Sequence, residues 1–432
     1  MTATAARVAA LRVMRAVRRG ILADRALHRE QAGLEPRERA WLQELVYGSL
    51  RLRGRLDQRI AGAVRRPLKE VEGDVLDVLR LGAYQLTEMG GVPAWAAVSE
   101  SVELVKPRGR GAAGFVNGVL KAIARADPSE GFPDPSADPV AWLSSWGSHP
   151  RWLVERWVAR FGIDGTRRLV DANNQRADLY IRPLRRSIDD ALEALARASV
   201  RGERVAGTGS VRLPPGTAPE DALAATPAVV QDPAAGLVVD CVAPEAGDTV
   251  ADLCAAPGGK ALALADGPAA RVVACDISER RTRRLAENAR RVGGRGLAVV
   301  VADAREPPLK EADVVLVDAP CSGTGTLRRH PDARWRVAPG DIVALTRLQD
   351  AILAAAAGIV RTGGVLVYAT CTLEPEENED RVESFLERHP EFGPEPCTSV
   401  EPGFLDLNGR LRVLPQVHGF DGAFAARLRR RD

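Results

Sequence analysis

The spacing of apolar and polar residues divides the chain into regions of different rhythm. From residue 1 to about residue 130, apolar residues recur at helical spacing, as in Val98, Val102 and Val105, and the polar breaks between them are short. Apolar residues three or four positions apart line one face of a helix. We therefore expect an all-helical domain over residues 1–130.

The first 23 residues allow two interpretations. They contain no acidic residue and five arginines, which is the composition of an organelle transit peptide. Their apolar residues nevertheless follow helical spacing, which favours a first core helix. These are Ala10, Val13, Met14, Val17 and Ile21.

A stretch rich in Pro, Asp, Ser and Gly, residues 127–136, interrupts the helical pattern and predicts a linker. Beyond it, residues 141–230 combine a helical pattern near residue 150 with a strand-like run at 179–184. Their aromatic and basic residues are compatible with RNA stacking, but a small α+β connector is the simpler prediction.

After residue 231, short apolar runs alternate with helical patterns, notably at 279–292 and 341–360. This alternation predicts a doubly wound, Rossmann-like α/β domain with a parallel sheet over residues 231–432. Two further runs, at 413–414 and 424–428, would close the sheet as a final antiparallel pair. The expected parallel strands are residues 249–253, 272–276, 298–302, 314–318 and 365–368.

Composition narrows the class of protein. With 45% hydrophobic and 27% charged residues, the chain has the make-up of a soluble globular protein. The net charge of +3 is mild but uneven, because residues 1–140 hold 22 Lys and Arg against 17 Asp and Glu. A basic N-terminal third is compatible with phosphate binding without requiring it.

The six cysteines have no spacing typical of a zinc site, so we expect no metal. Several lie on or beside apolar strands, where a reduced thiol packs as a small hydrophobic group. No run approaches the roughly 20 apolar residues of a membrane span. We therefore expect a cytoplasmic protein that does not contact a membrane.

A glycine-rich loop, CAAPGGK at 254–260, follows the first expected strand of the sheet. Gly258 and Gly259 permit a close approach of ligand to main chain, but the spacing is neither that of a dinucleotide-binding GxGxxG loop nor that of a P-loop. Asp276 ends the second strand, where an acid commonly accepts from ribose hydroxyls, and Asp303 follows the third, within reach of an adenine amino group. This order is the layout of an S-adenosylmethionine (SAM) fold.

Two cysteines follow later strands, Cys321 in Asp318-Ala319-Pro320-Cys321 and Cys371 in Thr370-Cys371-Thr372. Carbon 5 of cytosine is not nucleophilic, so its methylation requires prior addition of a nucleophile to carbon 6. A thiolate is suited to this because it adds readily and also leaves. Asp318 is placed to stabilise charge at ring nitrogen 3, and a base must afterwards remove the carbon-5 proton. These residues predict covalent chemistry on a pyrimidine.

These motifs carry a resemblance that covers the whole chain. It resembles the Sun-type RNA cytosine-5 methyltransferases of the RsmB branch, which modify small-subunit (16S) ribosomal RNA. The N-terminal third is similar to the NusB-like helical domain of that branch. The matching segments are CAAPGGK (254–260), DAPCSGTGTLRRHPD (318–332), TCTLEPEEN (370–378), VPAWAAVSESVELVK (92–106) and FVNGVLKAI (115–123).

The resemblance implies a role for each site residue. Cys371 would be the nucleophile, Cys321 would assist proton removal and product release, and Asp318 would be the partner of the ring nitrogen. DNA cytosine-5 methyltransferases use only a cysteine at the Pro-Cys position, so the second thiol argues for RNA. The residues expected to bind SAM are Cys254, Ala255, Ala256, Pro257, Gly258, Gly259, Lys260, Asp276, Asp303 and Asp318.

Two positions depart from the family pattern without touching a reacting group. Ala261 stands where a Ser or Thr is usual, and Ala423 where a second aromatic residue is common. For RNA recognition, the target base must be flipped out or already unpaired. A basic segment after Cys321 would either clamp neighbouring phosphates or remain a solvated loop: Arg328, Arg329, His330 and Arg334.

The sequence thus predicts a SAM-dependent cytosine-5 RNA methyltransferase acting on 16S ribosomal RNA, expected to be largely unassembled. One alternative is the same chemistry on transfer RNA or another RNA. The other is a non-catalytic, RNA-binding ribosome assembly factor, against which the joint presence of Asp318, Cys321 and Cys371 argues. The modified cytosine, the assembly stage and the oligomeric state are left open.

Overall fold

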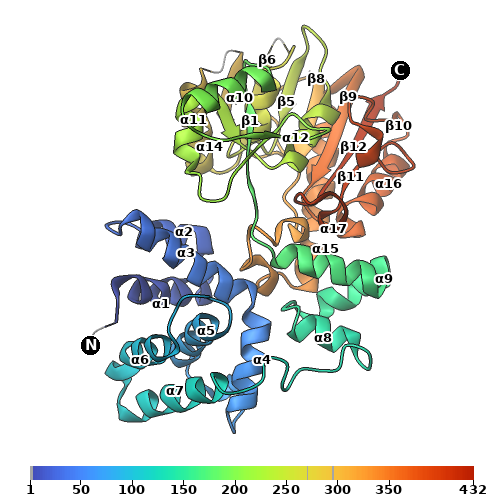
Figure 1. The fold of residues 1–432 in the computed structure, drawn as a ribbon. Helices are drawn as coiled ribbons and strands as arrows, with labels where there is room; N and C mark the ends of the chain where they lie inside the picture. Colours follow the sequence, from blue (N-terminus) through green and yellow to red (C-terminus); the bar gives the residue numbers. More distant parts are fainter. Residues whose placement is uncertain (1–2, 270, 294–295) are drawn as a thin grey trace. The chain divides into compact units, whose positions relative to one another are not determined.

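The computed structural model describes residues 3–269, 271–293 and 296–432. The chain forms two compact units, and Figure 1 labels their helices and strands. The first unit comprises Met1–Gln175 together with Leu327–Val337, and the second comprises Arg176–Thr326 together with Ala338–Asp432. The segment Leu327–Val337, which follows the Pro-Cys motif in sequence, therefore folds with the helices of the first unit.

The described part of the first unit contains only helical elements, as predicted for residues 1–130. α1 buries Ala10, Val13 and Met14 in the unit's core, which confirms the core-helix interpretation. Ile21 lies beyond the end of α1 and is 44% exposed, so it does not belong to that face. The helices are α1 (Ala5–Arg18), α2 (Ala23–Glu30), α3 (Pro36–Arg51), α4 (Arg53–Ala63), α5 (Gly73–Thr87), α6 (Ala94–Val105), α7 (Arg110–Ile123), α8 (Pro139–Ser145) and α9 (Arg151–Asn174).

The second unit begins with a small antiparallel sheet in the order β2-β3-β1-β4, accompanied by α10 and α11. Ile181 of β1 and Leu195 of α10 belong to its own apolar core. The predicted strand at 179–184 and the α+β character of this part are confirmed. The elements are β1 (Leu179–Pro183), α10 (Ile188–Arg197), β2 (Glu203–Arg204), β3 (Val211–Leu213), α11 (Pro219–Ala225) and β4 (Ala228–Val230).

The main sheet has the order β10-β12-β9-β8-β5-β6-β7, with β11 paired to β12. β5 to β9 are parallel, and β12 joins β9 antiparallel, so the predicted doubly wound sheet with an antiparallel end is confirmed. Its strands are β5 (Thr249–Asp252), β6 (Arg271–Asp276), β7 (Leu297–Val301), β8 (Ala312–Asp318), β9 (Val360–Thr370), β10 (Phe392–Glu395), β11 (Leu411–Val413) and β12 (Ala423–Arg430). β10 was not predicted, because Gly393 and Pro394 are weak strand formers.

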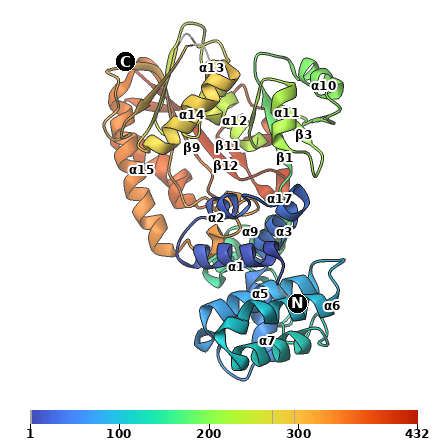
Figure 2. The ribbon, with the colours of Figure 1, turned by 90° about the vertical axis from the view of Figure 1, so that its left-hand side faces the viewer.

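Alternate residues of the central strands face opposite helical layers, as the two-residue period of a strand requires. On β8, Leu316 packs with α12 (Pro233–Val242), α13 (Gly259–Ala265) and α14 (Glu279–Val292), and Figure 2 shows α13 and α14 on this face. Val317 packs instead with α15 (Pro339–Ile359) and α16 (Glu379–Arg388). The short α17 (Pro415–His418) precedes β12.

α15 corrects one expectation. Its 21 residues are long and apolar enough to cross a membrane by length and composition, although the sequence was predicted to hold no such run. The helix lies against β8, β9 and α16, and its residues Ile352, Leu353 and Ala356 are buried there. α15 is a core helix of the second unit.

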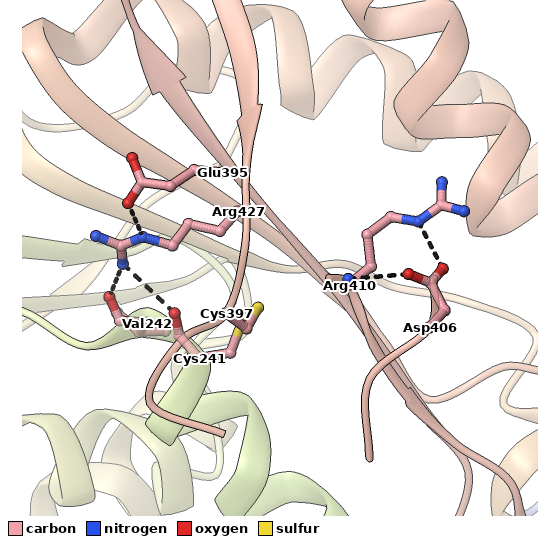
Figure 3. Close-up of a disulfide and its surroundings, with 7 residues drawn as sticks. All are labelled: Cys241, Val242, Glu395, Cys397, Asp406, Arg410 and Arg427. Atoms are coloured by element: carbon pink, nitrogen blue, oxygen red, sulfur yellow. Dashed lines mark hydrogen bonds and ion pairs between the residues drawn. A yellow bond between two sulfur atoms is a disulfide. The ribbon is translucent and has the colours of Figure 1, made fainter. Parts of the chain in front are cut away.

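The state of two cysteines also differs from the prediction. Cys241 of α12 and Cys397, which follows β10, form a disulfide with their Cα atoms 4.8 Å apart (Figure 3). The prediction of reduced thiols is therefore wrong for this pair, whose 156-residue separation gives no local signal. Beside it, Arg427 of β12 donates to Glu395 at 2.6 Å and to the carbonyl oxygen of Cys241 at 3.4 Å. Cys254, Cys275, Cys321 and Cys371 are free.

Candidate active site

The glycine-rich loop lies between β5 and α13, at the carboxyl end of the sheet where ligands of such folds bind. The Ala255 N–H donates to the Cys275 carbonyl oxygen at 2.8 Å, which fixes the loop against β6. Gly258 has φ of +109°, and a Cβ there would lie 2.7 Å from Leu285 Cγ. Glycine is therefore required by both conformation and space, as expected for a loop that follows a ligand closely.

Asp252, the last residue of β5, was not singled out from the sequence. Its side chain is fully buried, and neither carboxyl oxygen has a hydrogen-bond partner of normal geometry in the described structure. Burial, and next the charge of Asp318, raise the pKa of Asp252 from 3.8 to about 8. Buried polar groups are normally paired, so this carboxyl group beside the glycine loop fits the positively charged group of a cofactor such as SAM.

Asp276 and Asp303 have different environments. Asp276 is 3% exposed and accepts from the Ala256 N–H at 3.3 Å and the Ser278 N–H at 2.8 Å, so it connects the glycine loop to the start of α14. Asp303 follows β7 and pairs with Arg305 at 2.5 Å. Hydrogen bonds from Arg305 lower the pKa of Asp303 to about 2, which keeps this carboxylate ionised.

Lys260, the last residue of the glycine-rich motif, reaches the end of β8. Its Nζ lies 2.6 Å from Asp318 Oδ2. Burial lowers the pKa of Lys260, but the charge and the hydrogen bond of Asp318 outweigh this, so the net shift is upward. The charge of Cys371 contributes in the same direction. The ammonium group of Lys260 is thus electrostatically linked to both Asp318 and Cys371.

The two predicted reactive thiols meet. Cys321 Sγ lies 3.4 Å from Cys371 Sγ, and the Cys371 N–H donates to the same Cys321 sulfur at 3.4 Å. The hydrogen bond with Cys371, then burial, then the charges of Cys371 and Glu377 raise the pKa of Cys321 well above its ordinary value. This direction has a simple electrostatic reason, because a thiolate at Cys321 would repel a negative charge on the adjacent sulfur.

The loops that carry these thiols pack main chain against main chain. We call residues 319–326 the PC loop and residues 370–374 the TC loop. The Gly325 N–H donates to the Cys371 carbonyl oxygen at 3.0 Å, and the Gly422 N–H donates to the Gly325 oxygen at 2.8 Å. A Cβ on Gly325 would lie 2.7 Å from both Cys371 O and Gly422 Cα. This contact requires glycine.

Arg334 was predicted to clamp phosphate or to remain solvated, and neither is correct. The side chain is fully buried within the first unit, and burial, followed by the charge of Arg51, lowers its pKa to about 9. It is a structural arginine, whereas a phosphate role for Arg328, Arg329 and His330 stays a prediction. Its guanidinium donates to the oxygen atoms of Arg51 and Ser148 at 3.1 Å, Asn174 at 2.9 Å, Asn173 at 3.1 Å and Leu327 at 3.3 Å.

The doubly wound sheet with its antiparallel end and glycine loop defines the class of protein as a SAM-dependent methyltransferase. Family models extend this assignment. The model described as 16S rRNA methyltransferase RsmB/F matches residues 239–429, and the NusB family model matches residues 4–125. A third, described as the ferredoxin-like domain of RsmF/B-like methyltransferases, matches residues 149–213.

Relatives match along nearly the full chain. The probable ribosomal RNA small subunit methyltransferase B of Synechocystis sp. is 35% identical, covering 94% of each protein, and that of Bacillus subtilis is 33% identical, covering 92% of each. The chain belongs to the RsmB/F family of 16S ribosomal RNA methyltransferases. Among solved structures, PH0851 aligns with a TM-score of 0.79 at 26% identity over 98% of each chain. NSun6 from Pyrococcus horikoshii, solved with SFG, shares the fold with a TM-score of 0.56 at 21% identity, covering 66% of this chain and 98% of that one.

Proposed function

We propose that this protein transfers a methyl group to carbon 5 of a cytosine in 16S ribosomal RNA through a covalent bond between Cys371 and the base. The observation that carries the proposal is the 3.4 Å separation of the Cys321 and Cys371 sulfur atoms at the carboxyl end of the sheet. A nucleophile beside a second proton-transfer group is what addition and later elimination require.

In the first step, the Cys371 thiolate adds to carbon 6. A carbon–sulfur bond forms, and the displaced electron pair makes carbon 5 nucleophilic while nitrogen 3 gains a proton. An ionised carboxylate has no proton to donate, so Asp318 alone cannot supply it. The Lys260 ammonium, 2.6 Å from Asp318, makes the pair a proton source. The two residues act together at the ring nitrogen.

The cofactor supplies the methyl group, and residues 254–260 with Asp252, Asp276, Asp303 and Asp318 hold it. The arrangement of β5 to β8 brings these side chains to the end of the sheet at which the PC and TC loops begin. Asp252 is protonated in the free protein at neutral pH, because its pKa is raised to about 8. The cofactor's positive group would favour the ionised form of this buried carboxyl group and pair with it. Carbon 5 then carries both the new methyl group and its original proton.

Release requires that this proton leaves carbon 5 and that the bond to Cys371 breaks. Once Cys371 is bonded to the base, it no longer carries a negative charge or a thiol proton for Cys321. The hydrogen bond with Cys371 and the charge of Cys371, both of which raise the pKa of Cys321, are thereby removed. Cys321 then ionises more easily and takes the carbon-5 proton, either directly or through water. Elimination returns Cys371 as a thiolate, and nitrogen 3 gives its proton back to the Asp318–Lys260 pair.

For the substrate, we propose 16S ribosomal RNA in the cytoplasm, bound while largely unassembled so that the target cytosine can leave a stack. The family match and the NusB family model over residues 4–125 support an RNA partner. We propose the helical unit as an RNA-contacting part of the enzyme. Two hypotheses compete with this proposal. One is that the protein methylates transfer RNA or another RNA by the same chemistry, and the other is that it is a non-catalytic assembly factor.

The test is to incubate the purified protein with SAM and protein-free small-subunit ribosomal RNA, and to analyse the nucleosides by mass spectrometry. We expect 5-methylcytidine, and none with Cys371→Ala. If transfer RNA is methylated in a parallel reaction and ribosomal RNA is not, the substrate is transfer RNA rather than 16S ribosomal RNA. RNA binding without methylation of either RNA would favour the assembly factor.

A further inference from the structure

The residues on both sides of Cys321 are held by two buried side chains outside the PC loop. Glu377 and Gln349 of α15 are each 0% exposed. On one side of Cys321, Gln349 Nε2 donates to the Pro320 carbonyl oxygen at 2.9 Å. On the other side, the Ser322 N–H donates to Glu377 Oε1 at 2.9 Å, and the Ser322 hydroxyl donates to Glu377 Oε2.

The two buried side chains are also bonded to each other. Gln349 Nε2 donates to Glu377 Oε1 at 3.0 Å, so the same carboxylate oxygen accepts from α15 and from the PC loop. The Glu377 main chain is fixed as well, because the buried Tyr368 hydroxyl of β9 donates to the Glu377 carbonyl oxygen at 2.7 Å. A carboxylate that accepts several hydrogen bonds in a buried site has little freedom to move.

The same hydrogen bonds reach the TC loop. Ser322 Oγ lies 2.7 Å from Thr372 Oγ1, next to Cys371 in sequence, and Thr324 Oγ1 lies 3.0 Å from the same atom. Glu377 therefore acts on a residue adjacent to Cys321, which in turn contacts a residue adjacent to Cys371. The proximity of the two thiols is set through this chain of contacts, since the thiols themselves form only a weak hydrogen bond.

We propose that Glu377 is a positioning residue that, together with Gln349, fixes the main chain on both sides of Cys321 and thereby holds its thiol beside Cys371 for product release. This inference rests on the proposed function, because it assigns Cys321 to the release step. Glu377 itself does not touch the reacting atoms. Its effect is on the geometry of a proton-transfer group, for which a displacement of 1 Å costs roughly 100-fold in rate.

The main variant is Glu377→Gln, which keeps the size of the side chain but replaces an acceptor oxygen by a donor amide that faces Ser322 or Gln349. A second variant, Gln349→Leu, removes the hydrogen bond from Gln349 to the Pro320 carbonyl oxygen. The matched control is Asp350→Asn, next to Gln349 on α15. It removes a charge paired with Arg381 and Arg388, neither of which belongs to the PC loop.

The kinetic test compares one turnover with many. Because the nucleophile is intact, we expect Glu377→Gln to transfer the first methyl group, followed as S-adenosylhomocysteine, at a rate close to wild type. Formation of 5-methylcytidine and multiple turnover should fall roughly 100-fold, and a denaturant-resistant protein–RNA adduct should accumulate. Gln349→Leu should show the same pattern more weakly, and Asp350→Asn should behave as wild type. Equal losses in the first and later turnovers, with no adduct, would overturn the proposal and leave Glu377 with a stabilising role only.

A second measurement does not depend on methyl transfer. Diamide oxidises two adjacent thiols to a disulfide and takes up both hydrogens as it becomes a hydrazine. The rate at which Cys321 and Cys371 become joined, followed by peptide mass spectrometry, reports their proximity. We expect a slower rate in Glu377→Gln than in wild type and Asp350→Asn, and an unchanged rate would overturn the proposal. If wild type forms no 5-methylcytidine, the proposed function fails while this measurement still decides the positioning role.

Discussion

Lys260 Nζ lies 2.6 Å from Asp318 Oδ2, which joins the last residue of the glycine-rich motif to the last residue of β8. The two residues are 58 positions apart in sequence. Their contact connects the proposed cofactor loop with the strand that leads into the PC loop. It also gives Asp318 a proton-bearing partner, which an acid-catalysed role at the ring nitrogen needs.

Lys260→Met tests this pair. The substitution removes the ammonium group and leaves Asp318 and Asp252 as neighbouring acids without a compensating charge. We expect a loss of roughly 10²–10³ in the rate of a single turnover, the usual effect of deleting one electrostatic stabiliser. The control is Lys310→Met, because Lys310 is exposed. Equal activity of the two variants would exclude a role for Lys260 in catalysis.

Substitution of each of the two thiols should have a different effect on methylation and on adduct formation. Cys371→Ala should lower methylation by roughly 10⁴-fold or more, since it removes the nucleophile, and should leave RNA binding unchanged. Cys321→Ala should instead retain addition and accumulate a protein–RNA adduct that survives denaturant and electrophoresis. If Cys371→Ala is the variant that forms the adduct, the roles of the two residues are reversed.

Asp252 should make the stability of the second unit depend on pH. Its pKa is raised from 3.8 to about 8 in the folded state, so between these values the folded protein binds more protons than the unfolded chain. The free energy of unfolding should therefore fall as pH rises, by up to about 1.4 kcal/mol per pH unit.

Asp252→Asn removes this titration and should show a weaker decline in the free energy of unfolding when urea denaturation is compared at about pH 5 and about pH 8. The same variant should bind SAM less tightly, because it loses the carboxyl group that would ionise beside the cofactor's positive charge. Parallel pH profiles of wild type and variant would show that Asp252 is not protonated in the folded protein.

Gly325→Ala should disrupt the contact between the PC and TC loops. The added methyl group would meet the Cys371 and Gly422 main chains at 2.7 Å, and neither can move as a flexible side chain could. We expect a loss of about 1–3 kcal/mol in stability and a larger loss of activity. Gly340→Ala is the control, since a Cβ there would meet nothing within 4 Å. Wild-type activity in Gly325→Ala would contradict the observed packing.

Arg334→Ala should destabilise the first unit. It leaves several buried carbonyl oxygens without a donor, and we expect a loss of about 3 kcal/mol or more in chemical denaturation. Arg336→Ala, which removes an exposed partner of Asp332 in the same segment, should cost at most about 1 kcal/mol. If the losses in stability are similar, Arg334 is not the anchor that its contacts indicate.

Part of the site could be predicted from the sequence because the signals are local. Each apolar run marks a strand, and in a parallel sheet the residues that follow neighbouring strands meet at one edge. Asp318 ends β8, Cys321 follows it, and Cys371 follows β9. Because β8 and β9 are paired in the sheet, the approach of these residues was foreseeable. The ordered glycine loop, Asp276 and Asp303 belong to the same pattern.

Other features depend on contacts between distant residues. Arg334 reads as a solvated charge in a basic stretch, yet it is buried by α3 and by the segments at Ser148 and Asn174. Cys241 and Cys397 are each unremarkable in sequence and become partners only through the fold. Glu377 lies within the motif at 370–378, but its hydrogen bonds with Ser322 and Gln349 could not be predicted from that motif.

The sequence by itself determined the succession of helices and strands, the order of the motifs and the chemical groups available for the reaction, because these depend on residue type and short-range spacing. The tertiary structure decided which of these groups meet, which are buried and which hold a charge. The raised pKa of Cys321 beside Cys371, the raised pKa of Asp252 and the hydrogen bonds of Glu377 and Gln349 to the PC loop all follow from distance and desolvation, and neither quantity exists before the chain folds.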